Sequence, residues 1–277
     1  MTTSSPTSPP PGGPLLPQDG MRRRNLAALR SIIALVLREM STRYGRTPGG
    51  YLWALLEPLG MIIILGFAFS LIARSPGLGT SFLLFKATGF MILQIFTVLG
   101  NQVGRAMNFS KPLLFYPRVV WLDALLARFL LNALVVMLVT VLILAGIIVF
   151  EGIRTVLDYN KILLAIGLAA GLGFGIGCLN CYLFQRAPVW DQIWGIITRP
   201  LFLISGVIMT YEDLPPLAQK VLWYNPLLHV SGIMRDGFYP IYRPDYVSLV
   251  YIGLWILVPM LVGLLLLRRF HRELLNR

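Results

Sequence analysis

Six long apolar stretches follow one another along the chain. They lie near residues 51–74, 83–106, 121–150, 161–184, 190–210 and 246–267. Each holds about 20 or more mostly apolar residues, which is enough for a helix to cross a hydrocarbon core of about 30 Å. The runs lack the alternation of apolar and polar residues that marks barrel strands. The pattern predicts an all-α membrane protein with six transmembrane helices between residues 51 and 277.

Residues 21–50 have a different pattern. Apolar side chains such as Leu29, Ile33 and Met40 recur at steps of three and four, whereas Arg30 and Arg38 fall toward another face. This spacing is typical of an amphipathic helix that lies in the membrane interface. The sequence TPGG at 47–50 ends the helix and lets the chain turn into the first span.

The segment between the fifth and sixth stretches, residues 211–245, is dense in Tyr and Trp. Its apolar pieces are too short to span a membrane, and Pro215-Pro216 and Asn225-Pro226 separate them. Such pieces fit re-entrant or interfacial outer helices whose ends are buried in protein. The aromatic rings have two explanations, which are an aromatic belt at the headgroups or a surface that stacks on sugar rings.

Composition supports a membrane protein, because 56% of the 277 residues are hydrophobic and 13% are charged. The net charge of +12 would suggest nucleic acid in a soluble protein. Here most cations flank the apolar runs, so no nucleic-acid partner is expected. With both termini cytoplasmic, the inner segments hold fifteen Lys and Arg and the outer segments seven, which satisfies the positive-inside rule.

The first twenty residues are rich in Pro, Ser, Thr and Gly and predict a disordered tail over 1–20. Arg22, Arg23 and Arg24 resemble the basic start of a signal peptide. The apolar run after them is broken at Arg38-Glu39 and has no small-residue cleavage site. A basic segment at the membrane surface is the preferred interpretation.

No catalytic set is evident in the sequence, and no phosphate-binding loop occurs. His229 and His271 fall on opposite sides of the membrane in this topology, so no metal site is expected. The glycines between Gly167 and Gly177 fit small-xxx-small helix packing. Cys178 and Cys181 are interpreted as small apolar fillers.

Ionisable groups inside spans are costly and usually face protein or water. Glu57 and Arg199 are such groups, and each precedes a proline. They predict either the polar lining of a pathway or interfacial residues at a span edge. Asp123 and Arg128 lie near the start of the third span, and we expect them to be solvated or paired with each other.

A short basic and aromatic segment, about 105–120, joins the second and third spans. It is too short for a domain and too apolar for a solvated turn. A docking helix for a cytoplasmic partner is the preferred interpretation, and an idle surface helix is the alternative.

Several motifs together resemble the type-two ABC exporter permeases that export capsular polysaccharide. They are LREMSTRYGRTPGGYLWALLEPL at 37–59, then KPLLFYPRVV, RPLFLISGVIM, LPP and WYNPLLH, followed by Arg235. The resemblance covers nearly the whole chain after about residue 21.

The resemblance implies a six-helix permease at 51–277 that acts as a homodimer with two copies of a separate ATP-binding subunit. The 21–50 helix would be a gate, and 105–120 would dock the ATPase. ATP and Mg would be cofactors of that partner, with none on this chain. The substrate would be a lipid-linked anionic glycan, exported across a bacterial inner membrane and passed to periplasmic envelope partners.

Two sets of residues carry these expected roles. The expected substrate pathway comprises Arg43, Arg46, Tyr51, Trp53, Glu57, Arg199, Tyr211, Trp223, Tyr224, His229 and Arg235. The expected ATPase docking surface comprises Arg105, Asn108, Lys111, Phe115, Tyr116 and Arg118.

Three other functions stay open at this point. A lipid-linked O-antigen or teichoic-acid exporter shares the architecture. An integral membrane transferase normally needs clustered acids or a base, whereas the twelve Asp and Glu residues here are scattered. A secondary transporter normally shows an internal repeat, and none is found.

Overall fold

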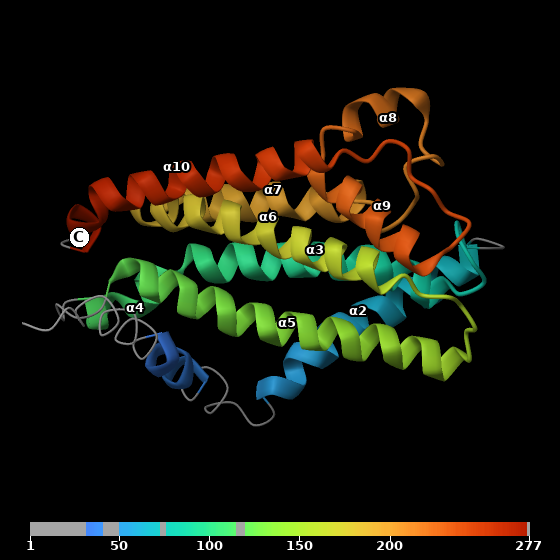
Figure 1. Cartoon of the computed structure of the whole chain (residues 1–277), viewed down its shortest axis with the longest axis horizontal. Helices are drawn as coiled ribbons and strands as arrows, with labels where there is room; N and C mark the ends of the chain where they lie inside the picture. The colour runs from blue at the N-terminus through green and yellow to red at the C-terminus, as the bar shows by residue number, and fades with distance from the viewer. Residues whose placement is uncertain (1–31, 41–49, 73–75, 115–119, 276–277) are drawn as a thin grey trace, which may run out of the picture.

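The computed structural model in Figure 1 describes residues 32–40, 50–72, 76–114 and 120–275. Every regular element within these ranges is a helix. A helix over 32–40 comes first. The helices that follow are α2 (Gly50–Ile72), α3 (Phe82–Gly104), α4 (Ala106–Leu114), α5 (Trp121–Glu151), α6 (Tyr159–Arg186), α7 (Val189–Ile204), α8 (Pro216–Leu222), α9 (Pro226–Phe238) and α10 (Leu249–Leu275).

Five helices of the described residues are long and apolar enough to cross a membrane. The qualifying segments are Leu52–Leu71, Phe82–Lys111, Trp121–Glu151, Tyr159–Arg186 and Leu249–His271. The expected all-helical membrane fold is therefore confirmed. The segments also match the first four and the last of the six predicted spans.

The predicted span at 190–210 is not confirmed, because α7 has only 16 residues. At 1.5 Å per residue this helix is about 24 Å long, shorter than a hydrocarbon core of about 30 Å. The helix ends at Ile204 with Ser205 as its C-cap, and Gly206 follows with a left-handed φ of 78°. Side chains from other helices bind the carbonyls after this break, so the backbone turns instead of continuing as a helix.

Helix α6 is the centre of the bundle, with α3 packed most extensively against it and α10 next. Glycines make these contacts close. A Cβ atom on Gly177 would lie 2.7 Å from Val103 Cβ of α3, and one on Gly175 would lie 2.5 Å from the Ile256 carbonyl oxygen of α10. The predicted role in helix packing is confirmed for Gly171 and Gly175, which face α10, and for Gly173 and Gly177, which face α3. It is wrong for Gly167, where a Cβ atom would meet no atom within 4 Å.

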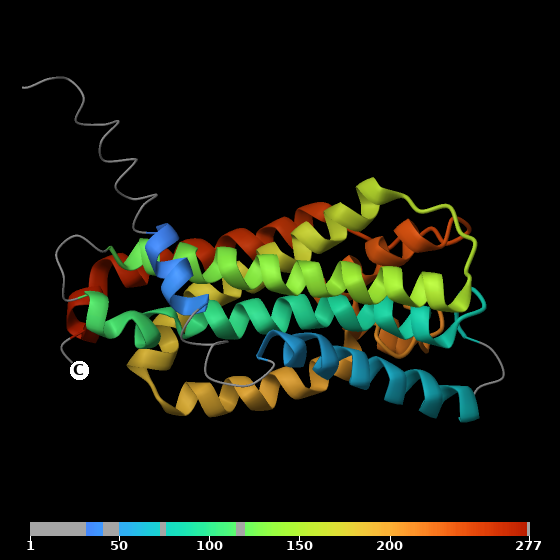
Figure 2. The same ribbon diagram turned by 90° about the horizontal axis from the view of Figure 1, so that it is seen from below.

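The bundle has two distinct ends, named here after their short helices. The α4 end holds α4 and the C-terminal turns of α6 and α10, and the α9 end holds α8 and α9 (Figure 1). Helices α2 and α7 project from the same face of the bundle, beside α3 (Figure 2). Large apolar side chains on both stay exposed, among them Trp53 and Phe67 on α2 and Ile196 on α7.

Candidate coupling and transport sites

Helix α4 lies at the junction of α3 and α5. Arg105 is the C-cap of α3 and its backbone N–H donates to the Asn101 carbonyl; α4 begins at the next residue. Met107 and Ser110 are buried against the bundle, whereas Asn108 and Phe109 are exposed. Over residues 106–111, the outward surface of α4 is therefore formed by Asn108 and Phe109.

The Arg128 side chain joins three elements at this junction. Its Nε donates to Glu39 Oε1 at 3.0 Å, and the two side chains are only 6% and 7% exposed. Its Nη1 donates to the Arg105 carbonyl at 3.1 Å, and its guanidinium lies 4.3 Å from the Phe109 ring centroid. Arg128 therefore ties the 32–40 helix to both the start of α4 and α5.

The expectation for Asp123 and Arg128 was wrong. Asp123 is buried and accepts the Val120 backbone N–H, so it caps the start of α5 rather than pairing with Arg128. Arg128 takes Glu39 instead, a partner 89 residues away in sequence. No periodicity within either segment signals this pair.

The expected docking residues lie in or near α4. Arg105 forms an ion pair with Asp191 of α7 at 2.9 Å, and both side chains are about half exposed. Asn108 is exposed and Lys111 is half-buried. Phe115, Tyr116 and Arg118 lie outside the described residues.

The expected pathway residues on the spans lie on two helices. Trp53 and Glu57 are exposed on α2, and Arg199 is exposed on α7. These helices project from the same face of the bundle (Figure 2). Arg43 and Arg46 lie outside the described residues, as does the side chain of Tyr51.

Two buried cations hold the backbone that follows α7. The Lys86 ammonium of α3 donates to the Ile208 carbonyl at 2.7 Å. The Arg235 guanidinium of α9 donates to the carbonyls of Gly206 and Met209 and lies 4.2 Å from the Phe85 ring centroid. Arg235 is 1% exposed, so its role in this structure is to fasten α9 to the turn.

Asn225, which precedes α9, also connects α9 to the end of α7. Its side-chain amide donates to the Ile204 carbonyl at 2.9 Å, and its oxygen accepts the Leu227 N–H as the N-cap of α9. One residue thus closes the end of α7 and opens α9. The sequence predicts only a break at Asn225-Pro226, because the contact of Asn225 with Ile204 joins residues 21 positions apart.

An aromatic cluster covers the α9 end, where α8, α9 and α10 meet. Tyr211 stacks on Tyr246 with ring centroids 4.1 Å apart, and Trp223 lies 5.1 Å from Tyr251. The Trp223 indole donates to the Tyr246 carbonyl at 3.2 Å. Tyr224 is 66% exposed, so it offers the largest free ring face among the expected pathway residues of this end.

His229 is buried inside this cluster. Its Nδ1 accepts the Ser248 backbone N–H, so its Nε2 is the donor to the Trp223 carbonyl at 2.7 Å. Burial lowers the pKa of His229, which favours the neutral ring that this pattern needs. His229 therefore positions Trp223 and the start of α10.

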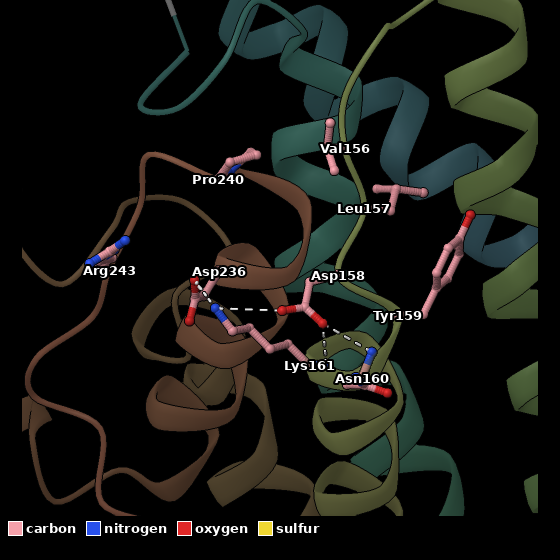
Figure 3. A pocket seen from close by; sticks show the side chains of 9 residues that line it. All are labelled: Val156, Leu157, Asp158, Tyr159, Asn160, Lys161, Asp236, Pro240 and Arg243. Atoms are coloured by element: carbon pink, nitrogen blue, oxygen red, sulfur yellow. Dashed lines mark hydrogen bonds and ion pairs between the residues drawn. The ribbon is translucent and has the colours of Figure 1, made fainter.

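A polar pocket of about 540 Å³ lies beside α9, at the start of α6 (Figure 3). The Lys161 ammonium sits between two carboxylates, 2.8 Å from Asp236 and 3.7 Å from Asp158. The Asp158 backbone N–H also donates to the Gly237 carbonyl at 2.9 Å. These bonds fasten the end of α9 to α6, so α9 is held at both of its ends.

Comparison with known proteins identifies the family. The sequence matches the profile described as "ABC-2 type transporter" over residues 30–239, which is most of the chain. The chain belongs to this ABC-2 family. The matched range runs from the segment before the 32–40 helix through α9. It therefore includes the α4 junction and the bonds from Arg235 to the carbonyls of Gly206 and Met209.

Several relatives of this ABC-2 protein carry a function in their names. The polysialic acid transport protein KpsM of Escherichia coli is 29% identical over 246 residues, which cover 89% of this chain and 95% of that protein. The capsule polysaccharide export inner-membrane protein BexB of Haemophilus influenzae is 27% identical, covering 88% and 92%. CtrC of Neisseria meningitidis serogroup B, with the same description as BexB, is 28% identical, covering 90% and 94%.

Proposed function

We propose that this ABC-2 protein is the transmembrane subunit of an ATP-driven exporter that moves lipid-linked capsular polysaccharide across a bacterial inner membrane. The observation that carries this function is similarity along nearly the full length of capsule polysaccharide export proteins. Similarity confined to one span would support only the fold. The basic net charge of +12 also suits an acidic glycan.

The α4 end faces the cytoplasm in this proposal, and α7 is a sixth, short crossing that leaves both termini inside. The sequence of α10 ends in RRFHRELL, whose Arg268 and Arg269 are exposed at the α4 end. The α6 helix ends and α10 begins at opposite ends of the bundle, so the chain crosses between them (Figure 1). The cations at the α4 end agree with the positive-inside rule.

A homodimer forms on the face from which α2 and α7 project. Both helices expose large apolar side chains and have few neighbours within the chain, which supports a second copy there. Between the two copies, Glu57 and Arg199 contribute charges to a polar conduit, since in-span charges usually face protein or water. The aromatic α9 end closes the outer mouth, where α8 and α9 are re-entrant helices and periplasmic partners bind.

The separate ATP-binding subunit docks on the outward surface of α4. ATP and Mg belong to that subunit. Movement of α4 reaches the 32–40 helix through Arg128, because one guanidinium contacts both. The 32–40 helix, with Ile33, Leu37 and Met40 exposed toward the membrane interface, then acts as the cytoplasmic gate. Two states of this junction give alternating access.

The proposal is tested by reconstituting the chain with an ABC exporter ATPase subunit in proteoliposomes. Nucleotide-dependent movement of lipid-linked acidic glycan into the lumen is the expected result. If only lipid-linked O-antigen or teichoic acid moved, that glycan would replace capsular polysaccharide as the proposed substrate. Glycosyl or acyl transfer by the isolated chain, independent of nucleotide, would overturn the transport function.

Glu57→Ala and Arg199→Ala are each expected to reduce glycan transport at least 10-fold while the dimer elutes normally. Both side chains are exposed, so their removal leaves no buried partner and costs little stability. Lys220→Ala, an exposed cation on α8, is the matched control. Transport at the control level in both mutants would remove these residues from the conduit.

Asn108→Trp is expected to weaken binding of the ATPase subunit at least 10-fold. The exposed Asn108 lies on the outward surface of α4, where a large ring blocks docking without entering the core. Co-elution of the two subunits measures the effect, and Gln219→Trp on α8 serves as control. Equal co-elution of both mutants would place the docking surface elsewhere.

A further inference from the structure

A groove runs between α2, α3 and α5, three of the helices that are long and apolar enough to cross a membrane. Its first part is a cavity of about 500 Å³ whose lining is apolar except for Glu151 at its end. Gly146 of α5 lies in its wall, and a Cβ atom there would meet no atom within 4 Å. The helices are therefore separated here by more than close packing requires.

A second cavity of about 550 Å³ continues the groove toward the α9 end. It shares Glu151 with the first cavity and adds the hydroxyls of Ser70, Thr80 and Ser81. Among the described residues that line the two cavities, none is Lys or Arg, and Glu151 is the single ionisable side chain. The groove is therefore apolar along one part and polar, with one negative charge, at its mouth.

The dimensions identify the class of occupant. From Leu142 to Glu151 the groove follows ten residues of α5, whose nine steps of 1.5 Å give about 14 Å along the helix axis. This length is about half of a hydrocarbon core of about 30 Å. Its apolar volume lies within the range of about 300–1,000 Å³ typical of small-molecule sites. An apolar slot one leaflet deep with a polar mouth has the shape of one lipid.

The mouth also selects a headgroup. Glu151 is the last residue of α5, where the partial negative charge of the helix C-terminus adds to its carboxylate. Ser70 donates its hydroxyl hydrogen to the Phe67 carbonyl, so toward a ligand its oxygen can serve only as an acceptor. Acceptors and negative charge favour an ammonium group and disfavour a headgroup that is only anionic.

We propose that this groove binds one phospholipid with an ammonium headgroup, such as phosphatidylethanolamine. Its acyl chain lies between α2 and α5 and its ammonium lies at Glu151. The lipid holds α2 at a fixed distance from α5 and so sets the position of the helix that carries Glu57. The lipid belongs to the outer leaflet if the α9 end faces outward, as proposed above. The binding site itself depends only on the groove and not on that orientation.

Native mass spectrometry of the purified full chain with phosphatidylethanolamine or phosphatidylglycerol tests the site. One phosphatidylethanolamine per chain is expected, retained about 10-fold better than phosphatidylglycerol. Gly146→Phe fills the apolar slot and is expected to abolish this retained lipid. Gly167→Phe on α6, where a Cβ atom likewise meets nothing within 4 Å, is the matched control and keeps it.

Glu151→Gln separates the contribution of the lipid headgroup from that of the acyl chain. The exposed carboxylate is removed without loss of core packing, so the protein stays folded. The variant is expected to retain lipid but to lose the preference between the two headgroups. Equal lipid retention by Gly146→Phe and Gly167→Phe would overturn the site, and equal retention of both lipids by the wild type would overturn its headgroup. Because no transport is measured, failure of the export function leaves these results unchanged.

Discussion

Arg128→Met is expected to lower the thermal midpoint of the protein by on the order of 10 °C. The substitution leaves Glu39 buried without its guanidinium, and breaking a buried ion pair costs about 3–5 kcal/mol. It also removes the hydrogen bond to the Arg105 carbonyl and the contact with Phe109. Heating in detergent followed by size-exclusion chromatography measures the midpoint.

The double variant Glu39→Leu, Arg128→Met removes both charges of the pair. Replacing both members of a buried pair by apolar residues is often neutral, so most of the lost stability is expected to return. Lys220→Met removes a cation from the surface of α8 and should shift the midpoint by less than about 2 °C. If Arg128→Met melted like Lys220→Met, the buried pair would not hold the 32–40 helix in place.

The same double variant separates folding from coupling. With the pair replaced by apolar side chains, the 32–40 helix keeps its packing but loses the directed bonds that connect it to the start of α4. In the reconstituted exporter we expect glycan transport to fall while the ATPase subunit still binds at α4. Loss of ATPase binding would instead show that Arg128 supports the docking surface.

Local patterns were sufficient to predict the parts of this fold that depend on lipid as solvent. A run of about 20 apolar residues can satisfy its backbone only as a helix in a membrane, whatever lies beside it. Five of the predicted spans follow from this rule. The contacts at Gly175 and Gly177 were also predictable, because small residues at a spacing of four leave a flat helix surface.

The length of α7 could not be predicted in the same way. The apolar run continues through residues 205–210, so hydrophobicity alone extends the helix. The break depends on three donors from two other elements, Lys86 of α3 and Asn225 and Arg235 of α9 and its N-cap. They bind the carbonyls that a continuing helix would use. Such long-range bonds leave no periodic signal. The Glu39 and Arg128 pair was missed for the same reason.

For the candidate sites, the sequence indicated which polar side chains need a partner but not which partner each one has. Arg235 and His229 were expected to face substrate, and the structure buries both in bonds to the backbone of neighbouring segments. Polarity in an apolar setting predicts that a side chain has a partner. It does not distinguish a substrate from a main-chain carbonyl.

Gly263→Leu is expected to destabilise the bundle by about 3 kcal/mol or more, because α10 touches α6 there backbone to backbone. A Cβ atom on Gly263 would lie 2.5 Å from both the Cys178 carbonyl carbon and the Leu179 nitrogen. Neither atom belongs to a flexible side chain, so the two helices have to separate. The contacts around the buried Cys178 and Leu267 are then lost as well.

Gly253→Leu supplies the matched comparison on the same helix. A Cβ atom at Gly253 meets nothing within 4 Å, and Gly in a helix interior costs about 1 kcal/mol relative to a good helix former. This variant should therefore match or exceed the wild-type midpoint, whereas Gly263→Leu should lie far below it. Helix propensity and lipid solubility change identically in the two variants, so the difference between their midpoints reports the packing of α10 on α6 alone. Equal midpoints would mean that α10 is not held against α6 at Gly263.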